Sequence, residues 1–223
     1  MNDLSALAEK FGSDKGPGKH RYTELYHMLF APFRDRDIRF LEMGLQIGGP
    51  EHERSVDRQT TDLPSVRMWL EYFRKAHITG LDVSDFSWFS DPRFTFIRCN
   101  MDNEVEIAEV AAEQEAFDII IDDASHASHH QQHAFVHLFP KLKSGGLYII
   151  EDLRWQPPVY ETRGYPKTAA LFGEYLETNS FTHPVSGLQE AFNEISNTFS
   201  GCFLFQAKFL KRRKDQVLVV HKV

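Results

Sequence analysis

The sequence has few of the features that mark several large protein classes. It contains only two cysteines, Cys99 and Cys202, among 223 residues. These are too few for a disulfide framework and lack the spacing of a zinc site. No apolar run approaches the roughly 20 residues that a membrane span needs, and the N-terminus has neither the basic flank nor the apolar core of a signal peptide. We therefore expect a soluble, cytoplasmic protein with no membrane partner.

Positive charge is also in short supply. The 25 Lys and Arg side chains face 32 Asp and Glu, which gives a formal net charge of −7 with histidine neutral. Proteins that bind the phosphate backbone normally show a basic face, so we expect no nucleic-acid partner. The length suits one compact domain with its own core.

Short apolar runs recur along the chain, and each ends at or near an acidic residue. The runs are 38–41, 77–81, 94–99, 117–121 and 146–150. Such Ile- and Phe-rich segments are typical of buried parallel strands. Residues with helical spacing lie between most of them, at 64–73, 105–111 and 134–139, and 143–146 indicates a turn before the last strand. The alternation predicts βαβ units and a mostly parallel sheet.

The C-terminal stretch differs from this alternation. Residues 202–210 and 217–221 are two strand-like runs joined by the charged segment 211–215. They predict a hairpin, so that one strand is antiparallel to an otherwise parallel sheet. We expect an α/β domain with a seven-stranded, mostly parallel sheet, a C-terminal antiparallel hairpin strand, and helices on both faces.

Acidic residues follow all five predicted parallel strands. They are Glu42, Asp82, Asp102, Asp122, Asp123, Glu151 and Asp152. Ligands of open α/β sheets bind beyond the carboxyl ends of the strands, which is where these acids gather. One acid alone is usually a helix N-cap, but seven at one edge repel each other unless a cation or a hydroxyl-rich ligand is bound there. The sequence therefore predicts a site for such a ligand, with a metal.

The loop after the first strand favours a nucleoside that carries positive charge. It lacks the G-x-G-x-x-G pattern of a dinucleotide site, and Glu42 precedes Gly44, which suits a cation better than a pyrophosphate. Asp82 ends the second strand and can hold both hydroxyls of a ribose. Its alternative role is a local cap.

Two sets of motifs carry a family resemblance. FLEMG at 40–44, GLD at 80–82 and FDIIIDD at 117–123 resemble class I S-adenosylmethionine-dependent methyltransferases. FGSDKG at 11–16, DDASH at 122–126 and YIIEDL at 148–153 are similar to a narrower group. That group is the macrocin and mycinamicin type of metal-dependent sugar O-methyltransferases, which usually has glycine at the position of Ala124.

The resemblance implies a Rossmann-like methyltransferase fold and an S-adenosylmethionine site. Glu42 and Gly44 would line the methionine end of the cofactor, Asp82 would hold the ribose, and Asn100 and Asp102 would lie near the adenine. Asp122 belongs to the same set of expected cofactor residues.

The resemblance also implies a magnesium site and a base. Asp123, Glu151 and Asp152 would hold Mg²⁺, and His126, with Asp123, would be catalytic. Carboxylate oxygens suit this hard cation, and a nearby base can take the proton of a metal-bound hydroxyl.

The acceptor would be a hydroxyl of a small molecule or sugar, in a natural product or glycan. The segments 50–63 and 154–166 depart from the family and are the loops that we expect to select it. Residues 1–36 would form an N-terminal helical segment or flap, residues 37–223 the cofactor domain, and the chain a homo-oligomer. The alternatives are an NAD-dependent oxidoreductase and a non-catalytic cofactor-binding protein of the same fold.

Two further segments have competing interpretations. His126, His129, His130, His133 and His137 crowd one helix start. Their four-residue spacing permits a zinc pair, but the HExxH glutamate is missing, so a solvated face is the simpler account of His129, His133 and His137. The glycine-rich segment 12–19 is either a flexible connector or the flap over the cofactor.

Overall fold

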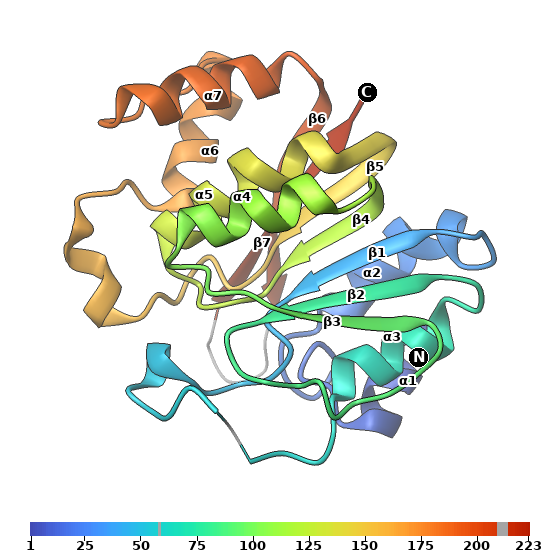
Figure 1. The fold of residues 1–223 in the computed structure, drawn as a ribbon. Coiled ribbons are helices and arrows are strands. Elements are labelled where there is room, and N and C mark those ends of the chain that lie inside the picture. The colour runs from blue at the N-terminus through green and yellow to red at the C-terminus, as the bar shows by residue number, and fades with distance from the viewer. Residues whose placement is uncertain (58, 209–213) are drawn as a thin grey trace.

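Seven strands form one sheet in the computed structural model, which describes residues 1–57, 59–208 and 214–223. The strands are β1 (Arg39–Met43), β2 (His77–Asp82), β3 (Phe94–Arg98), β4 (Phe117–Asp122), β5 (Leu142–Ile150), β6 (Phe199–Lys208) and β7 (Lys214–Lys222). Their order is β3-β2-β1-β4-β5-β7-β6 (Figure 1). The first five are parallel, and β7 runs antiparallel between β5 and β6.

The predicted sheet and hairpin are therefore confirmed. The part of the expected charged turn at 211–213 lies outside the described residues. None of the described helices is long and apolar enough to cross a bilayer.

Helices cover both faces of the sheet (Figure 1). One face carries α1 (Asp3–Phe11), α2 (Tyr22–Phe30) and α3 (Pro64–Tyr72), and the other carries α4 (Glu104–Glu113), α5 (Ser128–Leu138), α6 (Thr168–Thr178) and α7 (Ser186–Ser196). Short 3₁₀ turns span Ala31–Phe33, Pro50–His52, Phe139–Lys141 and Pro158–Arg163. Successive strand residues point to opposite faces: Ile119 and Ile121 pack with α1–α3, and Ile120 packs with α4–α7.

Local sequence signals set the helix starts. Pro64 opens α3, where its missing N–H is no loss. The side chain of Asn103 accepts a hydrogen bond from Val105 N at 3.2 Å and caps α4, whose first turn carries Glu104. Val105, which belongs to the apolar positions from which this helix was predicted, is 64% exposed and does not join the core.

The turn predicted at 143–146 is wrong. These residues lie inside β5, where the pairing with β4 shifts register between Leu142 and Leu147. Gly145 has φ of +77°, a left-handed conformation that glycine adopts without strain. Between the pairs Phe117–Leu142 and Ile119–Leu147, β5 has more residues than β4. These additional residues form an irregularity within β5 and do not end the strand.

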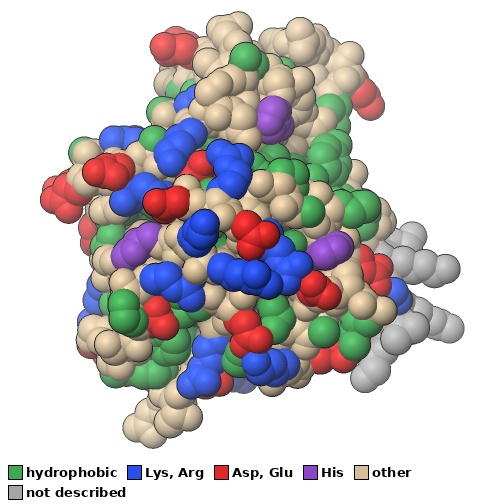
Figure 2. Space-filling view, turned by 90° about the vertical axis from the view of Figure 1, so that its right-hand side faces the viewer, with side chains coloured by type: hydrophobic (Ala, Val, Ile, Leu, Met, Phe, Trp, Pro, Cys, Tyr) green, Lys and Arg blue, Asp and Glu red, His purple; other side chains and the backbone are tan. Residues whose placement is uncertain are grey.

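Charge is mixed at the amino ends of the strands. On the face at the right of Figure 1, Lys and Arg side chains gather with Asp and Glu among them (Figure 2). At the start of β1, Arg39 lies 3.2 Å from Glu115, and at the start of β5, Lys143 lies 2.7 Å from Asp118. This pattern differs from the single-sign basic face of phosphate-backbone binders.

Phe135 of α5 is the centre of the core on the α4–α7 face and gives the first prediction. Its buried ring contacts five other rings, those of Phe139, Tyr148, Phe172, Phe192 and Phe199. We expect Phe135→Ala to lower the free energy of unfolding by about 3–5 kcal/mol, because it removes apolar contact and leaves a cavity. Denaturant unfolding measures this. The exposed Val105→Ala is the control, and equal losses in the two variants would contradict the assignment.

Candidate functional site

The acidic residues predicted at the strand ends meet at one edge of the sheet. Register places Met43 of β1 opposite Asp122 of β4, and Asp122 opposite Ile150 of β5. The residues that follow these strands, Asp123 and Glu151, therefore lie side by side. The parallel topology alone creates this concentration of negative charge.

A buried lysine from the N-terminal segment lies among these acids. Lys15 Nζ is 2.5 Å from Asp123 Oδ2, 2.8 Å from Glu151 Oε2 and 3.7 Å from Glu42 Oε1. Its side chain is 1% exposed. Glu151 Oε1 accepts a further hydrogen bond from Tyr26 at 2.6 Å, and Glu42 Oε2 accepts one from Ser65 at 2.9 Å. Lys15 thus neutralises part of a carboxylate cluster that the sheet brings together.

Backbone hydrogen bonds hold the segment that carries Lys15. Gly12 ends α1 in the left-handed conformation, with φ of 74°. Ser13 N donates to Ala8 O at 2.9 Å, and Thr23 N at the start of α2 donates to Lys15 O at 3.1 Å. The segment 12–19 therefore connects α1 to α2, as one of the two interpretations expected, and backbone hydrogen bonds hold it in one conformation. The sequence pattern offered no signal that this lysine is buried.

Burial and mutual repulsion shift the pKa values of the cluster. Burial raises the pKa of Glu42 to about 7, against the attraction of Lys15. It also raises the pKa of Asp123, and that of Glu151 rises well above its usual range. Burial opposes the charge on Lys15, but Asp123 and Glu151 outweigh it and hold the pKa of the ammonium well above normal.

Asp152 is held by a second set of groups. Tyr22 donates its hydroxyl hydrogen to Asp152 Oδ1. His20 Nδ1 lies 3.4 Å from the same oxygen and 2.8 Å from Asp215 Oδ2 of β7. Burial lowers the pKa of His20, but the hydrogen bond to Asp215 and the charge of Asp152 outweigh burial, so the pKa is raised. Sequence reasoning missed Asp215, because it lies about 60 residues from its partner along the chain and follows no parallel strand.

His126 faces the space between Asp123 and Asp152. Its Nε2 lies 3.5 Å from Asp152 Oδ2, and its Nδ1 lies 4.0 Å from Asp123 Oδ1. That Nδ1 is buried and has no hydrogen-bond partner among the described residues. His126 and Asp152 both have positive φ, 61° and 55°. Such backbone strain in non-glycine residues clusters at functional sites.

A cavity of about 270 Å³ lies beside this cluster. Four of the residues expected to bind cofactor line it: Gly44, Asp82, Asn100 and Asp102. The other two, Glu42 and Asp122, are buried and are not part of its lining. Burial raises the pKa of Asp122 to about 6.

Two lining residues shape this cavity. Asp82 Oδ2 accepts a hydrogen bond from Leu45 N at 2.9 Å, which fixes the loop after β1. Asp82 Oδ1 accepts a second one from Ser84 N at 2.8 Å. Gly44 has φ of +81°, and a Cβ there would lie 2.1 Å from the backbone oxygen of Asp123. Only glycine fits this close approach.

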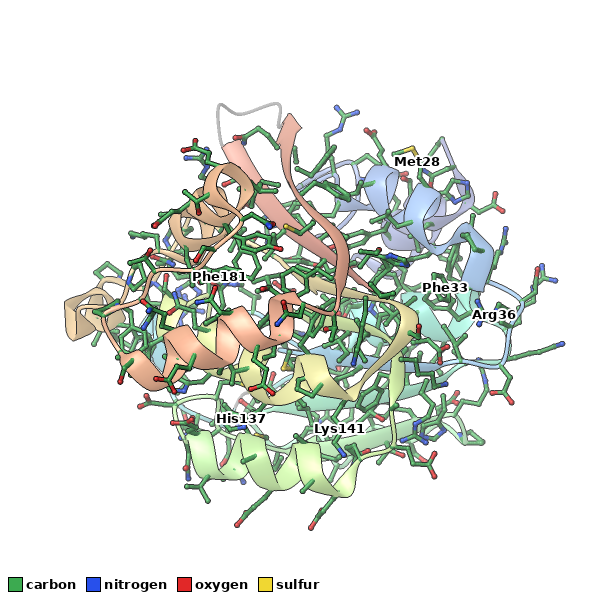
Figure 3. The ribbon with its side chains drawn as sticks, turned by 90° about the horizontal axis from the view of Figure 1, so that it is seen from above. Met28, Phe33, Arg36, His137, Lys141 and Phe181 are labelled. Atoms are coloured by element: carbon green, nitrogen blue, oxygen red, sulfur yellow. The ribbon has the colours of Figure 1, made fainter. Side chains whose placement is uncertain are left out.

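The expectation of a solvated face is wrong for His129, whereas His133 and His137 are half-buried. His129 and the neighbouring His130 are each 4% exposed, and both contact Asp102. His133 and His137 each lie near one oxygen of Glu104, at 3.2 and 3.0 Å. Figure 3 shows His137 between α5 and α4. These histidines therefore tie α5 to the segment after β3.

The two loops expected to select an acceptor meet near His126. The ring of Trp155 stacks on that of His52, with centroids 5.1 Å apart. The same indole lies edge-on to His126, 5.6 Å between centroids, and is 41% exposed. A half-exposed aromatic surface therefore borders the carboxylate cluster.

Comparisons with known proteins agree with this geometry. Over 151 residues, 68% of the chain, the sequence is 40% identical to 8-demethyl-8-alpha-L-rhamnosyl tetracenomycin-C 2'-O-methyltransferase of Streptomyces olivaceus, and 36% identical to demethylmacrocin O-methyltransferase of Streptomyces fradiae. A structure of the MycE methyltransferase from the mycinamycin pathway, in complex with Mg, SAH and mycinamycin VI, matches the whole chain with a TM-score of 0.74 and 26% identity. No family model matches the sequence.

The structure therefore matches that of a class I S-adenosylmethionine-dependent methyltransferase over the whole chain. Its homologues are the macrocin- and mycinamicin-type sugar O-methyltransferases, as the motifs predicted. The chain spans 38% and 36% of the two curated relatives and 54% of the MycE chain.

The buried position of Lys15 gives the second prediction. In buffer with chelator at pH 7.5, we expect Lys15→Met to lower the free energy of unfolding by about 3–5 kcal/mol, because it leaves buried carboxylates without their cation. The loss should shrink as the pH falls from 7.5 towards 4.5, because the buried carboxylates, whose pKa values burial raises, become protonated and no longer need a cation. The folded state binds protons more readily than the unfolded state across this range, so stability falls as the pH rises.

A matched control is Lys10→Met, which removes an exposed ion pair with Glu71. This pair contributes less than about 1 kcal/mol. Denaturant unfolding at several pH values compares the two variants. A Lys15→Met protein that is as stable as Lys10→Met at neutral pH would show that the buried ammonium does not stabilise the cluster.

Proposed function

We propose that the chain is an S-adenosylmethionine-dependent O-methyltransferase, assisted by Mg²⁺, that acts on a sugar hydroxyl of a small molecule. The observation that carries the proposal is that a cavity and a carboxylate cluster lie next to each other. A cavity lined by Gly44 and Asp82 opens beside the carboxylates of Asp123 and Asp152. The homology to sugar O-methyltransferases supports the same chemistry.

The residues of the cavity fit the cofactor. Gly44 lets the backbone approach closely, and Asp82 holds the loop after β1 beside the cavity through bonds from two backbone N–H groups. We assign the ribose hydroxyls to Asp82 and the adenine to the part of the cavity near Asn100 and Asp102. Glu42 and Asp122, which are buried and do not line the cavity, would attract the positively charged cofactor through their carboxylates.

The carboxylate cluster fits a divalent cation. Ligand atoms of Asp123, His126 and Asp152 lie within 4.8 Å of one another, and oxygen ligands suit Mg²⁺. We assign the metal to Asp123, Glu151 and Asp152. Because Lys15 contacts Asp123 Oδ2 and Glu151 Oε2, the ammonium and a metal at these two oxygens are alternatives.

Bound S-adenosylmethionine supplies an activated methyl group, and Mg²⁺ supplies a Lewis acid that acidifies the acceptor hydroxyl. His126 takes the hydroxyl proton at Nδ1, the buried atom without a hydrogen-bond partner among the described residues. Asp152, fixed by Tyr22 and His20, orients His126 from the Nε2 side. The remaining task of the protein is to hold acceptor and cofactor in line.

Other parts of the chain have supporting roles in this proposal. Residues 1–36 carry Lys15 and cover the cofactor end of the domain formed by 37–223. Residues 50–63 and 154–166, with Trp155 at the metal side, select the acceptor. A natural-product glycoside is the substrate class that the homologues favour. The homo-oligomer and the cytoplasmic location stay predictions.

Cofactor binding gives the third prediction. We expect calorimetric titration with S-adenosylhomocysteine to show binding by the wild type, with Mg²⁺ and with chelator. Asp82→Asn should weaken it about 10- to 100-fold, because hydrogen bonds to a charged group contribute about 1.5–3 kcal/mol. Asp85→Asn, on the exposed turn after β2, is the control and should bind as the wild type does.

Absence of S-adenosylhomocysteine binding by a folded wild-type protein would refute the proposed function. Titration with NAD tests the oxidoreductase alternative in the same instrument, and NAD binding in its place would favour that alternative.

Turnover gives the fourth prediction. With a panel of deoxysugar- and rhamnose-bearing natural products as acceptors, Asp123→Asn and His126→Gln should lower kcat about 10²- to 10⁴-fold, because each removes a group that acts on the reacting hydroxyl. Their affinity for S-adenosylhomocysteine should stay near that of the wild type. His137→Gln, on the helix α5 that follows His126 but away from the cluster, is the control. Full activity in the His126→Gln variant would remove His126 from the mechanism.

A further inference from the structure

A second group of metal-ligating side chains borders the cavity and shares no residue with the carboxylate cluster. It joins Asp102, which follows β3, to two adjacent residues of α5, His129 and His130. Their Nε2 atoms lie 3.4 Å and 3.1 Å from the same carboxylate oxygen, Asp102 Oδ1. We propose that these three residues form a binding site for a transition-metal ion such as Zn²⁺, separate from the Mg²⁺ site.

The spacing of the three ligand atoms suits a tetrahedral ion. Zinc binds imidazole nitrogen and carboxylate oxygen at about 2.0–2.1 Å, so neighbouring ligand atoms of a tetrahedral site lie about 3.3 Å apart. The two His–Asp distances fall close to this value. All three ligand atoms lie within 4.8 Å of one another. Small side-chain movements would therefore bring them into the coordination sphere of one ion.

The surrounding groups fix the imidazole rings. Both histidines are 4% exposed, and their ring centroids are 4.1 Å apart. Ser125 Oγ lies 2.5 Å from His130 Nδ1. A serine hydroxyl can donate to this nitrogen or accept from it, so it can hold His130 in the tautomer whose Nε2 ligates a metal. Such outer contacts orient metal-bound histidines in many proteins.

Ligand chemistry separates this site from the carboxylate cluster. Two imidazoles and one carboxylate favour zinc, copper, nickel or cobalt, whereas sites rich in carboxylate oxygen favour magnesium. The next histidines along α5 make a useful contrast. His133 and His137 contact different oxygens of Glu104, so their nitrogens do not converge on one point as those of His129 and His130 do.

The position of the site couples it to the cavity. Asp102, His130 and Ser125 all line the cavity wall, with Tyr160 beside them at 4.9 Å from the His130 ring. This step rests on the proposed function, in which the cavity holds the cofactor. A metal ion and a bound nucleoside would then compete for the same side chains, those of Asp102 and His130. Transition metals would then weaken cofactor binding, whereas Mg²⁺ would not.

Cobalt titration of the full chain tests the site. Co²⁺ replaces zinc and shows visible absorption bands when it is four-coordinate. In excess Mg²⁺, which fills the carboxylate cluster, we expect the wild type to bind one Co²⁺ with these bands. His130→Gln and Asp102→Asn, on two different elements, should each lower Co²⁺ affinity by at least about tenfold. His137→Gln and His126→Gln should keep the bands, and circular dichroism confirms that each variant is folded.

Three results would overturn the site. One is the absence of the cobalt bands in the wild type, and another is equal Co²⁺ affinity in the wild type, His130→Gln and Asp102→Asn. Loss of the bands in His126→Gln instead of His130→Gln would also overturn it, because it would place the ion in the carboxylate cluster.

A competition experiment separates this inference from the proposed function. Zn²⁺ should weaken the binding of S-adenosylhomocysteine to the wild type at least about tenfold and should have little effect on its binding to His130→Gln. Cobalt bands without any S-adenosylhomocysteine binding would uphold the metal site and refute the proposed function. S-adenosylhomocysteine binding that Zn²⁺ does not weaken would refute the coupling between the two sites.

Discussion

The structure depends on the ammonium group of Lys15, which lies between the carboxylates of Glu42, Asp123 and Glu151. Parallel strands deliver their carboxyl ends to one edge, so the acids that serve a site there must also tolerate one another. Removed from water, such a cluster is costly unless a cation compensates it. The chain carries that cation itself, on the segment between α1 and α2. The N-terminal helices are thereby tied to the sheet by charge as well as by packing.

The carboxylates of the cluster are stabilised in two ways, by an ammonium group and by hydrogen-bonding side chains. Glu42, Asp123 and Glu151 contact Lys15, whereas Asp152 is surrounded by Tyr22, His20, His126 and Asp215. A fixed ammonium neutralises part of the charge of the first group, and hydrogen-bond donors orient the second. His126 lies between the two, near Asp123 and Asp152 alike. The side chain proposed to accept a proton therefore borders both the neutralised and the oriented carboxylates.

What could be predicted from the sequence follows from this topology. The strands ending at Met43, Asp82 and Asp122 were visible as apolar runs, and parallel pairing brings the acids at their carboxyl ends to one edge. Lys15 and Asp215 were not predictable in the same way. Nothing in the local pattern of 12–19 distinguishes a buried lysine from a solvated one, and Asp215 reaches Asp152 only because β7 inserts beside β5. Contacts between residues far apart in the sequence determine the positions of Lys15 and Asp215, and local sequence patterns give little information about such contacts.

The histidines of α5 show the same limit more sharply. Four-residue spacing suggested His126 with His130, and His129 with His133, because such residues share a helix face. In the structure His126 precedes α5, and for the other four histidines the partner outside the helix decides the grouping. Asp102 follows β3 and lies opposite the first turn of α5, where the adjacent His129 and His130 both reach it. One turn later Glu104 takes His133 and His137. Helix periodicity states which side chains can meet, but the placement of the neighbouring carboxylate determines which of them do.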